Sequence, residues 1–303
     1  MQSIFMHVGL PKTGTTAFQQ LMDARRAQLL RAGLSYPGGE FVVDAKHQFL
    51  VGGLCSGNLS RFRALLNQID TSITLLPAEG LSNHLDDFRV DALSEFRESL
   101  DGFRVELIVV TREQQSWLRS YHGQCVLNPL GHANPLWGTA LGLSEIRHHP
   151  RVQRLLDCDV LCDDLGQAFG ASTVHRFDYD GPWMSGIFGL LGVDGLESDT
   201  APQANRSLPA WCIEWIRRMN LLEWSLDRQE WWRQRLRQYV ESTVPGISMI
   251  SHHRVPVGRD IQREASLLLG IDEWVDHAAG MEVRSFVTRS LDETGLSGGS
   301  RSS

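Results

Sequence analysis

The sequence predicts an α/β fold: a three-layer sandwich with a central parallel sheet, plus a helical C-terminal portion. Short, almost continuous apolar runs alternate along the first 180 residues with segments of helical periodicity. Continuous apolar strands are typical of a parallel sheet that helices cover on both faces. After about residue 180, strand candidates become sparse and helical segments follow one another. We therefore expect a single domain over residues 1–290, with a helical lobe over about 180–290 and a flexible Ser/Gly-rich tail over 291–303.

The chain begins with a predicted strand, loop and helix. The apolar run at residues 3–8 (SIFMHV) predicts a buried strand. A loop rich in Gly, Pro and Thr follows at 9–16, and residues 17–31 place their leucines near helical spacing. Gly33 then suits the C-terminal cap of that helix.

Further elements continue this alternation. We expect strands at 72–76 (SITLL), 105–110 (VELIVV) and 172–176 (STVHR), and helices at 90–100, 114–126, 209–220, 225–240 and 260–269. Five of the nine tryptophans lie between Trp211 and Trp232. Because tryptophan is mostly a packing residue, we expect these five to pack the helical lobe onto the sheet.

Composition indicates a globular protein. The chain has 303 residues, of which 42% are hydrophobic and 21% charged, enough to bury a sizeable core. A net charge of −7 disfavours broad, nonspecific binding of nucleic acid. The five scattered cysteines form neither a disulfide framework nor paired zinc spacing. The sequence has no transmembrane-length apolar run and no signal pattern, so we expect a cytoplasmic protein.

Lysine is scarce in this chain. Of the 29 basic residues, 27 are Arg, and only Lys12 and Lys46 are lysines. Two lysines in 303 positions place one in a given eight-residue window only about 5% of the time by chance. Lys12 nevertheless lies inside the loop at 9–16, which indicates a functional role for that loop.

The loop, GLPKTGTT, has the features of a phosphate cradle. It joins a buried strand to a helix N-terminus, where free backbone N–H groups and the helix dipole attract anions. Gly14 permits close approach of the backbone to a ligand, and Lys12 adds a compact positive charge. The pattern departs from a Walker A loop, because Lys12 precedes Gly14 by two positions. The strand at 105–110 also leads into Thr111 and Arg112 instead of an acidic metal ligand.

The segment PKTGTT after an N-terminal strand resembles the 5′-phosphosulfate loop of sulfotransferases that use 3′-phosphoadenosine 5′-phosphosulfate (PAPS). The matching residues are Pro11, Lys12, Thr13, Gly14, Thr15 and Thr16. Arg112 and Ser120 reproduce the spacing with which family members bind the donor's 3′-phosphate, and a guanidinium can fork two phosphate oxygens. The resemblance covers the first 130 residues and implies a P-loop-like fold of the bacterial type. Asn205, Arg206 and Ser207 resemble a segment that closes over the nucleotide in some bacterial relatives.

The resemblance implies an enzyme that transfers the sulfuryl group of PAPS to a hydroxyl of a carbohydrate or small metabolite. The product would be adenosine 3′,5′-bisphosphate, and no metal ion is required. Lys12 would stabilise the charge on the leaving phosphate. In relatives, the strand before the 3′-phosphate strand carries a catalytic His or Glu in some branches. Glu79, after the strand at 72–76, is therefore our candidate general base, and His47 is its rival.

Two other functions stay open at this point. A P-loop phosphotransferase would share the fold, and a non-catalytic relative would bind nucleotide as an interaction module. The motifs describe the donor side of the site only, so they identify neither the acceptor nor the oligomeric state.

Overall fold

The computed structural model describes residues 1–128, 134–193, 208–222, 226–243, 286–287 and 289. The chain divides into two compact units. The first consists of residues 1–121 and 143–204, and the second of residues 122–142 and 205–303. Helix α11 (Trp183–Leu191) belongs to the first unit, so the helical lobe begins later than the expected position near residue 180.

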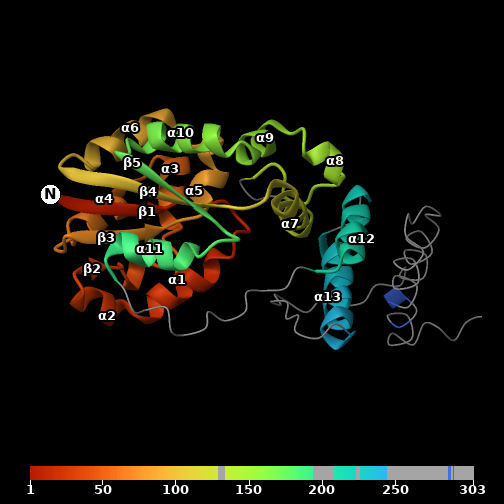
Figure 1. The fold of residues 1–303 in the computed structure, drawn as a ribbon. Coiled ribbons are helices and arrows are strands. Elements are labelled where there is room, and N and C mark those ends of the chain that lie inside the picture. Colours follow the sequence, from red (N-terminus) through yellow and green to blue (C-terminus); the bar gives the residue numbers. More distant parts are fainter. Residues whose placement is uncertain (129–133, 194–207, 223–225, 244–285, 288, 290–303) are drawn as a thin grey trace, which may run out of the picture. The chain divides into compact units, whose positions relative to one another are not determined.

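The first unit contains a parallel sheet of five strands (Figure 1). Its strands are β1 (Gln2–His7), β2 (Leu34–Ser35), β3 (Ile73–Pro77), β4 (Phe103–Thr111) and β5 (Thr173–Asp178). The order is β2-β3-β1-β4-β5, and every neighbouring pair is parallel. The central strand β1 therefore lies between β3 and β4, and the loops after these three strands meet at one edge. This architecture confirms the predicted α/β sandwich.

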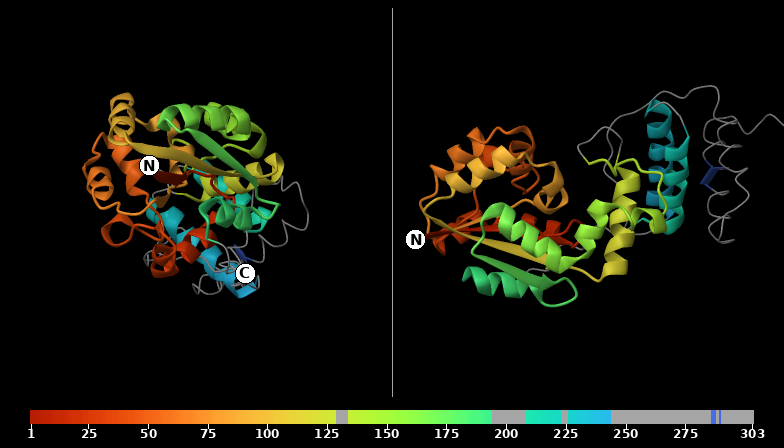
Figure 2. Two further views of the ribbon diagram at one scale, coloured as in Figure 1. Left: turned by 60° about the vertical axis from the view of Figure 1, so that its left-hand side comes forward. Right: turned by 90° about the horizontal axis from the view of Figure 1, so that it is seen from above.

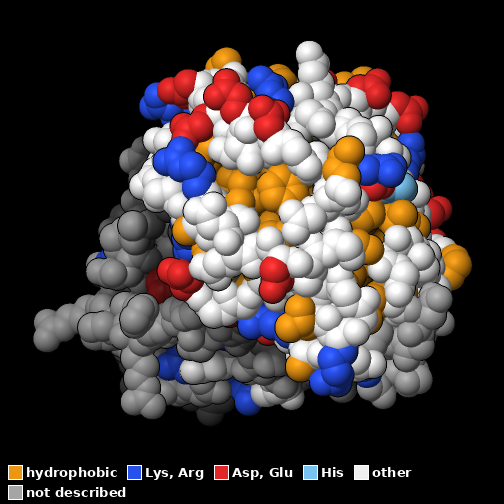
Figure 3. All heavy atoms as spheres, turned by 90° about the vertical axis from the view of Figure 1, so that its left-hand side faces the viewer, with side chains coloured by type: hydrophobic (Ala, Val, Ile, Leu, Met, Phe, Trp, Pro, Cys, Tyr) orange, Lys and Arg blue, Asp and Glu red, His pale blue; other side chains and the backbone are white. Residues whose placement is uncertain are grey.

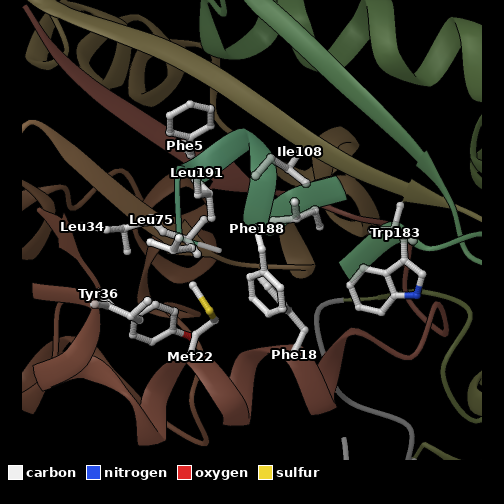
Figure 4. Packing of buried hydrophobic residues seen from close by; sticks show 14 residues of the cluster. Phe5, Phe18, Met22, Leu34, Tyr36, Leu75, Ile108, Trp183, Phe188 and Leu191 are labelled. Carbon is white, nitrogen blue, oxygen red and sulfur yellow. The ribbon is translucent and has the colours of Figure 1, made fainter. Parts of the chain in front are cut away.

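Helices cover both faces of the sheet (Figures 1 and 2). On one face lie α1 (Thr15–Ala24), α2 (Arg26–Arg31) and α11. Their apolar side chains pack with those of the strands; Phe18 and Phe188, for example, lie 5.8 Å apart between ring centroids (Figure 4). Burying such aromatic side chains contributes about 1.5–3 kcal/mol each.

The opposite face has its own aromatic core. It carries α3 (Phe49–Ser56), α4 (Ser60–Leu66), α6 (Val90–Ser99) and α10 (Cys158–Phe169). Phe62 of α4 stacks on Phe96 of α6 at 4.3 Å, and Phe96 meets Phe169 of α10 edge to face. Short helices α5 (Gly80–Asn83), α8 (Leu143–Ile146) and α9 (Pro150–Leu156), with the 3₁₀ turns η1 (Gly39–Phe41) and η2 (Leu85–Asp87), connect these elements.

The helix predicted over 17–31 is in fact two helices. It breaks at Arg25, which has φ −107° and ψ 16°, and the bend brings α2 against the short strand β2. Leu29 is fully buried there. Hydrophobic periodicity predicts that both segments are helical, but it contains no sign of the bend or of a two-residue strand.

The second unit is helical in its described part. Helix α7 (Gln114–Leu127) enters it, and α12 (Ala210–Leu221) and α13 (Leu226–Thr243) correspond to two predicted helices. Trp215, Trp232 and Phe286 are fully buried together. The four described tryptophans of this set thus pack within this unit's own core, whereas we expected the five to pack a lobe onto the sheet; Trp224 lies outside the described residues. The helix expected at 260–269 and the tail at 291–303 lie outside the described residues.

The surface and the cysteines add two observations. At the end of the first unit where the strands begin, acidic and basic side chains are interspersed around a hydrophobic area (Figure 3). All five cysteines are free. Among the described helices, none combines the length and the hydropathy needed to span a bilayer.

A tight turn precedes α3 and contains two residues in left-handed conformation. Val43 and Lys46 form an antiparallel bridge, with N–H···O distances of 3.0 and 2.9 Å. Between them, Asp44 has φ 50° and Ala45 has φ 61°. This geometry is that of a two-residue hairpin turn, which usually contains Asn or Gly because other residues are strained there.

We expect Ala45→Gly to be more stable than a matched glycine variant elsewhere. Glycine adopts a φ of 61° without the left-handed penalty of about 1–2 kcal/mol, although it also makes the unfolded chain more flexible. Ala32→Gly is the control, because Ala32 has φ −85° and gains nothing from glycine. Urea unfolding should place Ala45→Gly above Ala32→Gly by about 1 kcal/mol. Equal stabilities would show that the turn is not strained.

Candidate active site

The loop between β1 and α1 lies at the C-terminal edge of the sheet, between the ends of β3 and β4. Lys12 has φ 67° and Gly14 has φ 69°. A lysine in the left-handed region is strained by about 1–3 kcal/mol, and such strain is commonly found at functional sites. No side chain caps α1 at Gly14, so the first N–H groups of the helix are not used by a cap.

The carbonyl groups of this loop are bound by surrounding side chains. Ser82 donates to the Gly9 carbonyl at 2.8 Å, and Trp117 donates to the Pro11 carbonyl at 2.8 Å. Arg112 donates to the Lys12 carbonyl at 3.1 Å. In a trans peptide the N–H points away from the C=O, so several loop N–H groups point away from these anchors. This orientation is the one that the phosphate cradle predicted at residues 11–16 would need, and anion binding by the loop stays a prediction.

Glu79 lies beside the loop, and its carboxylate contacts three residues. It follows β3 and precedes α5. Its Oε1 accepts hydrogen bonds from the Thr15 hydroxyl and from Gln19 Nε2, the latter at 3.0 Å. Its Oε2 lies 3.7 Å from the Nζ of Lys46. Within the described part of the chain, Oε1 accepts two hydrogen bonds and Oε2 has only this longer contact, so Oε2 is the less engaged oxygen.

Lys12 is exposed, yet the surrounding protein changes its ionisation. Desolvation lowers the pKa of Lys12. The negative charge of Glu79 opposes that effect, and the positive charges of Lys46 and Arg112 add to it. An anion bound beside the ammonium would raise the pKa of Lys12 again, so the electrostatics favour an anionic ligand.

The second predicted anion-binding residue, Arg112, lies next to the loop. It follows β4, and besides its bond to the Lys12 carbonyl it lies 5.0 Å from the centre of the Tyr179 ring. Ser120 is partly buried on α7. This helix is fixed by neighbours of Ser120: Trp117 bonds the loop, and the Tyr121 hydroxyl donates to Asn83 at 2.7 Å.

Sequence reasoning missed Tyr179. It follows β5, and its N–H donates to the Thr111 carbonyl at 2.8 Å. A Cβ at Gly14 would lie 2.7 Å from a carbon of the Tyr179 ring, so Gly14 is required both by its φ and by this contact. Only the position of Tyr179 after a predicted strand could have drawn attention to it.

The rival base, His47, is buried and bound elsewhere. Its Nε2 lies 3.0 Å from the Pro37 carbonyl, and its backbone N–H donates to the Pro77 carbonyl at 2.8 Å. Burial lowers the pKa of His47 to about 4, although the bond to Pro37 opposes this. Glu79 thus contacts Thr15 next to the loop, whereas the His47 ring is bonded to Pro37; which of the two acts as a base stays a prediction. Asn205, Arg206 and Ser207 lie outside the described residues.

A second histidine, His7, lies buried at the end of β1. Neither ring nitrogen has a hydrogen-bond partner in the described part of the chain. Burial lowers the pKa of His7 to about 4, opposed by the charge of Glu79 and supported by that of Lys46. His7 is therefore neutral near pH 7 and packs edge to face on Phe18.

A polar cleft of about 570 Å³ lies near Arg112, at the ends of β4 and β5. Its lining includes Arg112 and Arg176 together with acidic residues such as Asp157 and Asp178. Lys12 and Glu79 do not line it. Of the predicted site residues, the cleft therefore shares only Arg112.

Two of the buried histidines, His7 and His47, should make stability depend on pH. Both histidines have a pKa of about 4 in the folded protein and 6.5 in the unfolded chain. Between these pH values the unfolded chain therefore binds more protons than the folded protein. Stability is therefore fully present above pH 6.5 and decreases as the pH falls toward 4. Each histidine contributes about 2–3 kcal/mol to the difference between pH 7 and pH 4.5.

His47→Gln keeps an N–H donor for Pro37 but cannot protonate in this range, so its loss of stability at acid pH should be smaller by that amount. Urea unfolding at both pH values measures the difference, and the exposed His148→Gln serves as the control. Equal acid losses in His47→Gln and wild type would show that His47 is not buried in its neutral form.

Comparisons with family models, curated proteins and solved structures found no match to this chain. The likeness to sulfotransferases therefore depends on the motifs around Lys12 and Arg112 and on the positions of these residues in the fold.

Proposed function

We propose that this chain is a sulfotransferase that moves the sulfuryl group of PAPS to a hydroxyl of a carbohydrate or small metabolite. One observation carries the proposal: Arg112 adjoins the loop that contains Lys12, and its side chain donates a hydrogen bond to the Lys12 carbonyl. PAPS has two separate anionic groups, at its 5′ and 3′ positions. A loop rich in backbone donors suits the 5′-phosphosulfate, and a guanidinium suits the 3′-phosphate.

The reaction uses groups on both sides of the loop. An acceptor hydroxyl attacks sulfur and gives its proton to Oε2 of Glu79. As the new O–S bond forms, the S–O bond to the 5′-phosphate breaks, and adenosine 3′,5′-bisphosphate leaves with the electron pair. Lys12 and the loop N–H groups stabilise the charge that develops on this phosphate. The scheme uses no metal ion.

A phosphotransferase is the second candidate, favoured by the bond between Thr15 and Glu79. In P-loop phosphotransferases, Mg²⁺ is held by a hydroxyl of the loop and an acidic residue at a strand end. Thr15 has such a hydroxyl, and Glu79 is such an acidic residue. Glu79 follows β3, which lies on the other side of β1 from β4 and Arg112. Lys46 beside Glu79 opposes it, because an ammonium repels a divalent cation at the same carboxylate.

Transfer of radiolabelled sulfur from PAPS to a panel of sugars and small alcohols tests the proposal. We expect transfer by wild type in the presence of EDTA. Glu79→Gln should bind adenosine 3′,5′-bisphosphate normally while its turnover falls at least about a hundredfold. For a phosphotransferase, the same variant would instead lose magnesium-dependent binding of ATP. Binding of the bisphosphate without any transfer would indicate a non-catalytic relative.

Lys12→Arg should lose most of the turnover, although the substitution keeps the positive charge. The ammonium is compact, whereas the guanidinium is planar and larger, so it cannot follow the leaving oxygen from the same strained backbone position. We expect a decrease of about a hundredfold. The reverse exchange at an exposed site, Arg31→Lys, is the control and should leave turnover unchanged. Full activity of Lys12→Arg would exclude a specific role for this lysine.

A further inference from the structure

The two lysines of this chain both interact electrostatically with Glu79, and Lys46 contacts it directly. Lys12 and Lys46 are 34 positions apart, in the loop after β1 and in the turn before α3. Lys46 Nζ lies 3.7 Å from Glu79 Oε2, and both Glu79 and Lys46 affect the ionisation of Lys12. In a chain with 27 arginines, one of the two lysines thus contacts Glu79, and the other lies where the charge of Glu79 raises its pKa.

The backbone around Lys46 is built to hold it in this position. Lys46 follows Asp44 and Ala45, two consecutive residues with positive φ. The buried Tyr36 hydroxyl donates to the Ala45 carbonyl at 2.6 Å. On the other side, His47 is fixed by the carbonyl groups of Pro37 and Pro77. A strained turn persists only when its surroundings determine it, and here those surroundings direct Lys46 toward Glu79.

We propose that Lys46 is a positioning residue that keeps the Glu79 carboxylate ionised and in place when the anionic donor binds. The inference rests on the function proposed above. PAPS brings several negative charges beside Glu79, and like charges favour protonation of a carboxylate. A protonated Glu79 cannot accept the proton of the acceptor. Lys12 is engaged by the donor phosphate, so the second cation must come from Lys46.

The charged and titratable groups around Glu79 can be named. Lys12 lies in the loop after β1 and Lys46 in the turn before α3. The neutral His7 lies at the end of β1. Thr15 and Gln19 of α1 donate to Oε1 and carry no charge. Once an anion neutralises Lys12, Lys46 is the remaining cation among these groups.

Carbon-13 NMR of the Glu79 carboxyl group, titrated with adenosine 3′,5′-bisphosphate bound, tests the inference without an acceptor. The signal is identified by its absence in Glu79→Gln. We expect Lys46→Met to move the titration midpoint upward by about one pH unit or more, and Lys46→Arg to restore it. Lys46→Gln is a second neutral variant. Arg31→Met removes the same charge from the exposed end of α2 and should leave the midpoint unchanged.

Turnover gives a second readout. In Lys46→Met we expect kcat to fall about tenfold or more, the acid limb of the pH–rate profile to shift upward, and the affinity for the bisphosphate to change less than about threefold. Failure of wild type to bind the bisphosphate would overturn the proposed function and this inference with it. Normal binding, with coinciding titrations of wild type, Lys46→Met and Lys46→Gln, would overturn the inference alone.

Discussion

The contacts of the Glu79 carboxylate determine how the site is assembled. Its two oxygens connect α1, through Thr15 and Gln19, with the turn that carries Lys46. The sheet order makes this possible, because β1 lies between β3 and β4 and the segments after these strands meet at one edge. Loss of the carboxylate would leave partly buried donors and an ammonium without this acceptor, at a cost of about 1–3 kcal/mol or more.

The loop after β1 is anchored through its carbonyl groups. Its carbonyl groups accept hydrogen bonds from Ser82 of α5, from Trp117 of α7 and from Arg112, which follows β4, so the loop is held in place without a ligand. Such preorganisation lowers the reorganisation needed when charge develops in a reaction. The strain at Lys12, with φ 67°, is offset by these same contacts. Arg112 therefore has two roles, as an anchor of the loop and as a candidate phosphate ligand.

Much of the fold could be predicted from the sequence. Apolar runs and helical periodicity reflect which side chains are buried. Continuous apolar runs mark the buried strands β1, β3 and β4, so these strands were expected, and β5 was expected as well. The bend at Arg25 and the two-residue β2 were not, because both depend on packing between elements. The tryptophans of α12 and α13 were expected on the sheet but pack with one another, since composition does not specify a partner.

The candidate site was predictable where residue types and loop positions determine its chemistry, as at Lys12, Gly14, Arg112 and Glu79. The contacts of Lys46 and Tyr179 were not predictable. Lys46 reaches Glu79 through a turn whose positive φ values fall on Asp and Ala, residues that give no turn signal as strong as Asn-Gly. Tyr179 reaches Gly14 across the sheet, and such a contact has no local pattern in the sequence.

The central claim is that the Lys12 loop and Arg112 bind the two phosphates of one nucleotide. Calorimetry in EDTA with adenosine 3′,5′-bisphosphate and with adenosine 5′-monophosphate tests it most directly. The account predicts that the bisphosphate binds about ten- to a hundredfold more tightly and that Arg112→Ala removes this difference, since a charged hydrogen bond contributes about 1.5–3 kcal/mol. Equal affinities for the two nucleotides, or binding that requires magnesium, would contradict it.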